Sequence, residues 1–256
     1  MSDNAANETG NYIFTLPDGL VIKYLKDGWR KHGCKYPNVM DDFLFVMYPE
    51  VESRIRYLNL KPGDIMIDVG ACIGSWTIHA ALLGAHVHAF EMGESQLKAL
   101  DYNLRLNNIQ DRVTVHDTAL QADDTQEMLF DGIMQMRSRP VIESCIKAAS
   151  LKQIPKESII YTDVMKPVKS TTLDNWMKEN RDSVTHIELI KIDIEGMELE
   201  VLHGALHTIR EFIPNLVVEI HDNDNPQLRI DIEKFLKDLG YKQKRVPGLN
   251  DYFYQP

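Results

Sequence analysis

Residues 65–76 read IMIDVGACIGSW, and this stretch decides the fold of the 256-residue chain. Its first five residues are apolar apart from one Asp, which is typical of a strand buried on both faces of a parallel sheet. Two glycines follow, and glycine lets the backbone turn tightly and lets a ligand approach without a Cβ in the way. Strand, glycine turn and helix in this order predict a ligand site at the carboxyl end of the strand.

Strand and helix patterns alternate after this stretch, which predicts an α/β fold with a doubly wound, mostly parallel sheet of about seven strands. The last two strands read as an antiparallel C-terminal hairpin, a known addition to such sheets. The predicted strands cover residues 65–68, 86–91, 112–116, 187–193, 216–221, 241–246 and 251–254, and the predicted helices cover 75–83, 95–106, 198–212 and 227–239.

Two segments stand outside this alternation. Residues 1–48 predict an N-terminal extension with two short strands, and residues 49–256 predict the main domain, which opens with a helix over 49–60. Residues 122–171 separate the third and fourth core strands, and loops of this length are usually functional or disordered. We therefore expect an inserted lobe or lid at the edge of the sheet.

The composition disfavours several classes of partner. The chain carries 38 acidic and 28 basic residues, and an acidic surface repels the phosphates of nucleic acids. No apolar run approaches the roughly 20 residues of a transmembrane helix. Three scattered cysteines without a CxxC pair, and no signal peptide, predict a cytoplasmic protein without a disulfide framework or zinc site. The sequence leaves the oligomeric state open.

The glycine turn lacks the features of a phosphate-binding loop. Its spacing is D-x-G-x-x-x-G over Asp68, Gly70 and Gly74, whereas dinucleotide sites show G-x-G-x-x-G and phosphate loops end in G-K-[ST]. An acid at the loop entrance suits a ligand with a positive amino group, such as the methionine end of S-adenosylmethionine (SAM). On the next strand, Glu91 can accept hydrogen bonds from ribose hydroxyls. Asp117 is placed to reach an adenine amino group or to cap a turn.

Acids and a histidine follow the fourth and fifth core strands. Asp193 is expected to orient the substrate or the sulfonium of SAM, and Glu195 to accept a proton. His221 is a candidate general base, because histidine titrates near neutrality, and its alternative is a hydrogen bond to the neighbouring loop. Glu198 reads as a first-turn helix acid. A divalent metal held by Asp193, Glu195, His221 and Asp222 is an open alternative, but spacing cannot establish ligand distances and no metal is predicted.

Together these residues resemble the FkbM-like family of class I SAM-dependent methyltransferases. The resemblance covers roughly residues 43–239 and rests on the segments KPGDIMIDVGACIGSWT, AFE, KSTTLDNW, IKIDIEGMELEVLHGA and PNLVVEIH. It implies a Rossmann-like fold, SAM as cofactor and O-methylation of a hydroxyl on a small molecule or sugar. It also implies that Tyr48-Pro49-Glu50 closes over the cofactor. Cys72 stands where the family usually has Asn, Met92 where Pro is common, and Met197 where Ala is usual.

Residue by residue, these arguments give one set of site predictions. The predicted cofactor-binding residues are Glu50, Asp68, Gly70, Ala71, Cys72, Gly74, Glu91, Met92, Asp117, Thr118, Ala119 and Asp193, and the predicted catalytic residues are His221, Glu195 and Asp193.

Other functions stay open at this point. The first alternative is an N-methyltransferase acting on nucleic acid or protein. Base-modifying members of the superfamily typically carry an Asn/Asp-Pro-Pro-aromatic motif after the fourth strand, where this chain has DIEGME. The others are a SAM-binding subunit without catalysis of its own and a nucleotide-sugar or NAD enzyme.

Overall fold

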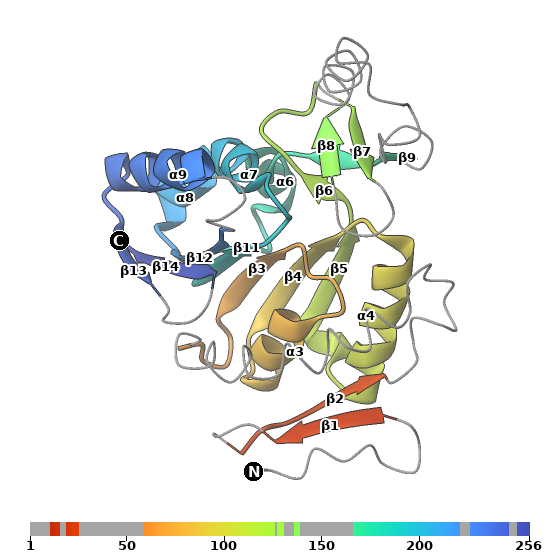
Figure 1. The fold of residues 1–256 in the computed structure, drawn as a ribbon. Coiled ribbons are helices and arrows are strands. Elements are labelled where there is room, and N and C mark those ends of the chain that lie inside the picture. The colour runs from red at the N-terminus through yellow and green to blue at the C-terminus, as the bar shows by residue number, and fades with distance from the viewer. Residues whose placement is uncertain are drawn as a thin grey trace.

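A seven-stranded sheet forms the centre of the fold (Figure 1). The structure, a computed structural model, describes residues 11–15, 19–25, 59–125, 127–130, 136–138, 166–220, 226–245 and 250–256. Five neighbouring strands run parallel, in the order β5 (Val113–Asp117), β4 (His86–Glu91), β3 (Ile65–Val69), β11 (Leu189–Ile192) and β12 (Asn215–Glu219). β14 (Asp251–Gln255) pairs antiparallel with β12, and β13 (Lys242–Arg245) pairs antiparallel with β14. The predicted sheet and its antiparallel C-terminal hairpin are confirmed.

Two helical layers cover the faces of this sheet (Figure 1). Along β3, Ile65, Ile67 and Val69 belong to one apolar cluster and Met66 to the other, because successive residues of a strand point to opposite faces. Both faces are therefore buried, which explains the near-continuous apolar run in the sequence. One layer holds α3 (Ser75–Leu82) and α4 (Glu94–Leu106), and the other holds α6 (Leu173–Asn180), α7 (Glu198–Gly204), α8 (Leu206–Phe212) and α9 (Pro226–Asp238).

The predicted single helix over 198–212 is wrong, because the structure has two helices, α7 and α8, with a break at Ala205. A Cβ on Gly204 would lie 1.9 Å from the carbonyl oxygen of Gln121, so glycine lets another segment of the chain approach closely there. Apolar spacing continues through both helices, and spacing does not report a local break. Helix α6 was not predicted at all, although Thr172 caps it by accepting a hydrogen bond from the N–H of Asn175.

The described parts of the insert form a small sheet of their own (Figure 1, upper right). β7 (Met128–Phe130) pairs antiparallel with β8 (Met136–Ser138) and with β9 (Lys166–Val168). Below it, β6 (Ala119–Leu120) and β10 (Ser170–Thr171) pair in parallel. The chain therefore leaves and returns at neighbouring positions, which is the geometry of an insertion. That residues 122–171 act as a separate lobe stays a prediction.

The N-terminal strands β1 (Asn11–Thr15) and β2 (Val21–Leu25) pair antiparallel beside α4 (Figure 1). The side chain of Asn107 bonds both backbone groups of Lys23, accepting from its N–H at 2.9 Å and donating to its carbonyl oxygen at 2.7 Å. Apart from residues 59 and 60, the predicted helix over 49–60 lies outside the described residues. None of the helices in the described ranges has the length and apolar character needed to cross a bilayer.

Candidate functional site

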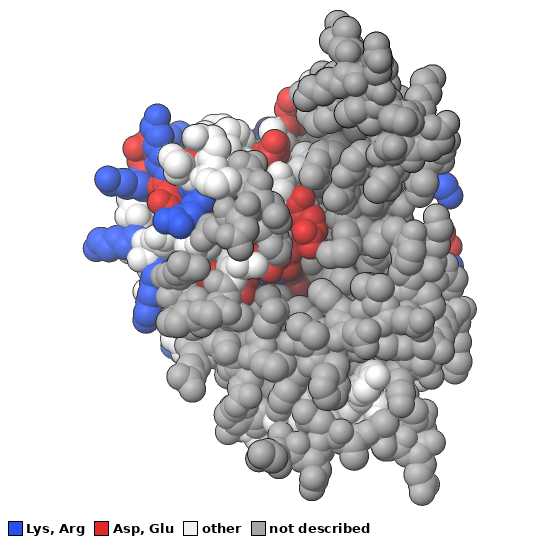
Figure 2. All heavy atoms as spheres, in the orientation of Figure 1, with Lys and Arg blue, Asp and Glu red and all other residues white. Residues whose placement is uncertain are grey.

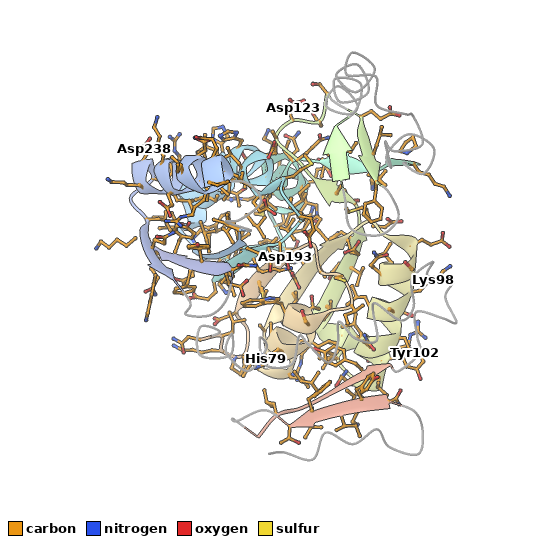
Figure 3. All side chains as sticks on the ribbon, viewed as in Figure 1. His79, Lys98, Tyr102, Asp123, Asp193 and Asp238 are labelled. Carbon is orange, nitrogen blue, oxygen red and sulfur yellow. The ribbon has the colours of Figure 1, made fainter. Side chains whose placement is uncertain are left out.

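Most predicted site residues meet at the carboxyl edge of the sheet. Strand register places Val69 beside Phe90 and Glu91 beside Asp117, so β3, β4 and β5 end next to one another. On the other side of β3, the N–H of Asp193 donates to the carbonyl oxygen of Val69 at 3.1 Å. Asp193, labelled in Figure 3, accordingly lies in the middle of the molecule, where the strands end. A ligand in an open parallel sheet binds at such an edge.

The loop after β3 has the backbone geometry of a ligand turn. Gly70 and Gly74 have φ angles of 75° and 94°, in the left-handed region. A Cβ on Gly70 would lie 2.0 Å from the carbonyl oxygen of Asp193, so only glycine fits where the loop passes the end of β11. The N–H groups of Gly70 and Ala71 both donate to the carbonyl oxygen of Phe90 at 3.0 Å, which fastens the loop to β4.

Glu91 holds this loop through its buried carboxylate. Oε2 accepts a hydrogen bond from the N–H of Cys72 at 2.8 Å, and Oε1 accepts from the N–H groups of Met92 and Gly93 at 2.9 and 2.7 Å. A carboxylate has about four acceptor positions, so Oε2 keeps one for a ribose hydroxyl. Burial raises the pKa of Glu91, and the three backbone N–H groups oppose that rise.

Cys72 adopts a backbone conformation that Asn also favours. Its φ angle is 51°, in the left-handed region, where Asn is several-fold enriched among non-glycine residues. Burial and the nearby carboxylates of Glu91 and Asp193 raise the pKa of its thiol, so the thiol is protonated at neutral pH.

We expect Cys72→Asn to raise the free energy of unfolding by about 1 kcal/mol, because Asn tolerates the left-handed backbone better than other side chains. Urea denaturation measures this change. Cys72→Ala is the matched control, since it removes the thiol and keeps the backbone penalty. Equal stability of the Asn and Ala variants would contradict the prediction.

Asp68 lies beneath the loop and is already bonded. Its side chain is completely buried, its Oδ2 accepts a hydrogen bond from the hydroxyl of Thr77 at 2.6 Å, and its Oδ1 lies 3.1 Å from Nζ of Lys191. The predicted contact between Asp68 and a ligand amino group stays a prediction. Neither Thr77 nor Lys191 was predicted as a site residue. The available signal was a lysine inside an apolar strand, because a buried charge requires partners.

Three acids converge beyond β11 and β12. One carboxylate oxygen from each of Asp193, Glu195 and Glu219 lies within 4.8 Å of the others, and all three side chains are half-buried. Glu195 has a φ angle of 58°, and non-glycine residues in this region cluster at functional sites. Glu219, the last residue of β12, was not predicted. Such oxygens can receive a proton or hold a divalent cation. The sequence left a divalent metal open as an alternative, but with His221 and Asp222 in place of Glu219.

Glu198 folds back onto the turn that carries these acids. Its Oε1 accepts hydrogen bonds from the N–H groups of Ile194 and Gly196 at 3.3 and 2.9 Å, and the residue is 2% exposed. Burial raises its pKa to about 7, although the bond from Gly196 opposes the rise. Its role is therefore to shape the turn between Asp193 and Glu198, in addition to the first-turn position expected from the sequence.

This burial makes stability depend on pH. Glu198 titrates near 4.5 in an unfolded chain and at about 7 in the fold, so the folded state binds more protons between these values. Its stabilising contribution is complete below pH 4.5 and is lost as the pH rises through 7, by about 3 kcal/mol at most. Relative to Glu198→Gln, the free energy of unfolding of the wild type should thus fall between pH 5 and pH 8 in urea denaturation.

The control is Glu200→Gln, on the same helix, which should keep the pH dependence of the wild type. Parallel curves for the wild type and Glu198→Gln would show that Glu198 does not titrate in this range.

The remaining predicted residues divide into two groups. Glu50 and His221 lie outside the described residues, so their roles stay predictions. Asp117 is exposed at the end of β5, whereas Thr118 and Ala119 are buried beside it. The hydroxyl of Thr118 donates to the carbonyl oxygen of Asp117 at 2.7 Å, so this hydroxyl is engaged within the turn.

Comparison with known proteins adds four similarities. A family model described as the Methyltransferase FkbM domain matches residues 68–242. The 31-O-demethyl-FK506 methyltransferase FkbM of Streptomyces tacrolimicus is 28% identical over 82% of this chain and 81% of that protein. A ribosomal protein L11 methyltransferase of Oceanobacillus iheyensis is 28% identical over 51% of this chain and 41% of that protein. The crystal structure of a methyltransferase FkbM from Methylobacillus flagellatus superposes with a TM-score of 0.51 at 19% identity, covering 78% of this chain and 45% of that one.

Proposed function

Because this chain belongs to the FkbM family of SAM-dependent methyltransferases, we propose that it methylates a hydroxyl of a small molecule or sugar. The site fits SAM, since the glycine turn after β3 lies at the carboxyl edge of the sheet and Glu91 keeps an acceptor position for a ribose hydroxyl. When bound, SAM supplies the methyl group and keeps the electron pair of the broken sulfur–carbon bond, which leaves S-adenosylhomocysteine. The work of the protein is then to align the acceptor oxygen with the methyl carbon and to remove the hydroxyl proton.

The observation that carries the proposal is the convergence of Asp193, Glu195 and Glu219 next to the cofactor loop. Asp193 contacts the loop through its backbone, and we expect the three carboxylates to face the side where an acceptor would meet the methyl group. An unactivated hydroxyl has to lose its proton as the new oxygen–carbon bond forms, and a carboxylate or a histidine can receive it. We assign that proton to Glu195 or His221.

The charge of the described residues on this face favours an acceptor without phosphates. Figure 2 shows acidic side chains gathered in the middle of this view, whereas Lys and Arg side chains gather at its left, over α9 and β13. Carboxylates near the acceptor would repel a nucleic-acid backbone. The name of the Streptomyces relative likewise specifies an oxygen of a small molecule as its target.

We also propose that the insert, residues 122–171, selects the acceptor. It starts three residues after the candidate adenine residues Asp117 to Ala119 and returns beside them through β10, so it is rooted at the same edge of the sheet.

Transfer of tritium from labelled SAM tests the proposal. Sugars and hydroxylated natural products form one set of acceptors, and RNA, ribosomal protein and peptides form the other. We expect label in the first set only. Label in RNA or protein would favour the alternative suggested by the L11 methyltransferase relative, and SAM binding without transfer to any acceptor would favour a non-catalytic subunit.

A further inference from the structure

Lys191 is a buried cation to which the proposed chemistry gives no role. It is the third residue of β11, between Ile190 and Ile192, and its side chain is 3% exposed. A buried ammonium is costly unless it is paired and hydrogen-bonded. The groups around its Nζ therefore indicate what it does.

The described residues place at least four oxygens around this Nζ atom. Two belong to carboxylates, Oδ1 of Asp68 at 3.1 Å and Oδ2 of Asp193 at 3.5 Å. Two are backbone carbonyl oxygens, which accept its hydrogen bonds, from Gly70 at 2.7 Å and from Val69 at 3.3 Å. The ammonium of Lys191 thus contacts the end of β3 at Val69, the start of the cofactor loop at Gly70, and the carboxylate of Asp193.

Strand register produces this arrangement. Lys191 lies opposite Asp68 in the parallel pair of β3 and β11, so their side chains share one face of the sheet. Both strands end within two residues of this pair, and a lysine stem is long enough to carry its ammonium to the strand ends. The charge therefore lies directly beneath the loop that begins at Gly70.

We infer that Lys191 is a positioning residue for the cofactor. Its ammonium holds the carbonyl group of Gly70 and the carboxylate of Asp193 in the arrangement that receives SAM, and it acts on SAM through these two residues. The inference rests on SAM binding, which the family membership gives, and does not depend on the class of acceptor.

If Lys191 were purely structural, it would serve only to neutralise Asp68. Single and double variants of Lys191 and Asp68 distinguish this structural role from the positioning role. Lys191→Met alone leaves a buried carboxylate without its cation and should be strongly destabilised. Asp68→Asn combined with Lys191→Met removes both charges, so its melting temperature should recover to near that of Asp68→Asn. The double variant still lacks the hydrogen bond from Lys191 to the carbonyl oxygen of Gly70 and the ion pair with Asp193.

Calorimetric titration with SAM alone gives the deciding comparison. Asp68→Asn/Lys191→Met should bind SAM about tenfold or more weakly than Asp68→Asn, which corresponds to the loss of one hydrogen bond to a charged group. A Kd within twofold of the Asp68→Asn value would overturn the inference. So would a double variant that fails to fold while Asp68→Asn folds, because Lys191 would then be structural.

Lys98→Met is the control for loss of a lysine, because Lys98 lies on the surface of α4, where it pairs with Glu94. Its Kd for SAM should equal that of the wild type. No acceptor is present in these titrations, so failure of the O-methylation proposal would appear only in the tritium assay.

Discussion

Replacing Glu91 by Gln is expected to weaken SAM binding by at least about 100-fold, because at least two hydrogen bonds to its carboxylate are lost and each contributes about 1.5–3 kcal/mol. One lost bond comes from a backbone N–H of the loop, since the amide of Gln offers an NH2 group where Glu91 has an acceptor oxygen. The other is the expected bond from a ribose hydroxyl. Calorimetric titration with SAM measures the change.

The control for this substitution is Glu94→Gln, three residues along the chain. The Glu94 side chain is 85% exposed and pairs with Lys98, so its variant should bind SAM as the wild type does. If Glu91→Gln bound SAM within threefold of the wild type, Glu91 would be neither the ribose ligand nor a support of the loop.

Removal of the general base is expected to lower kcat by about 10²–10⁴-fold. Glu195→Gln keeps the shape of the side chain and removes its capacity to accept a proton, and His221→Ala tests the other candidate. The variant that lacks the base should keep the SAM affinity of the wild type within a few-fold, because the acid or histidine acts on the acceptor. Single-turnover methyl transfer and calorimetric titration separate the two quantities.

Two variants at other positions control for these changes. Glu200→Gln lies on α7, and His207→Ala replaces an exposed side chain of α8. A loss of kcat in only one of the test variants identifies the base. Full kcat in both Glu195→Gln and His221→Ala would refute the assignment of the proton to either residue.

The sequence predicted the fold because the fold depends on local patterns. Apolar runs of strand length, glycine after Val69 and helical spacing after Gly74 all lie within short segments, and together they predict a parallel sheet with its ligand edge. The same reasoning failed over residues 198–212, where the structure has two helices that meet at Ala205, next to the close approach of Gln121 to Gly204. That contact joins segments far apart in the chain, so spacing could not reveal it.

In the candidate site, too, local patterns predicted some features, whereas contacts between distant segments decided others. Motif positions predicted that Asp68, Glu91 and Asp193 share one edge of the sheet, and the strand register places them there. The atoms that already bond these carboxylates were not predictable, because they come from other strands and from backbone N–H groups. Lys191 is the plainest case, since only the pairing of β3 with β11 places its ammonium beside Asp68.

The sequence by itself predicted the class of the fold, the family and the edge of the sheet where SAM is expected to bind, because each of these predictions rests on residue type and spacing along the chain. Only the tertiary structure decided that Asp68 lies beneath the loop and forms an ion pair with Lys191. It also decided that Glu198 folds back and accepts a hydrogen bond from the turn after β11. It also decided that Cys72 and Glu195 take left-handed backbone angles. The physical reason is that a buried charge, a closed turn and a left-handed residue are each stabilised by partners that the fold brings from elsewhere in the chain.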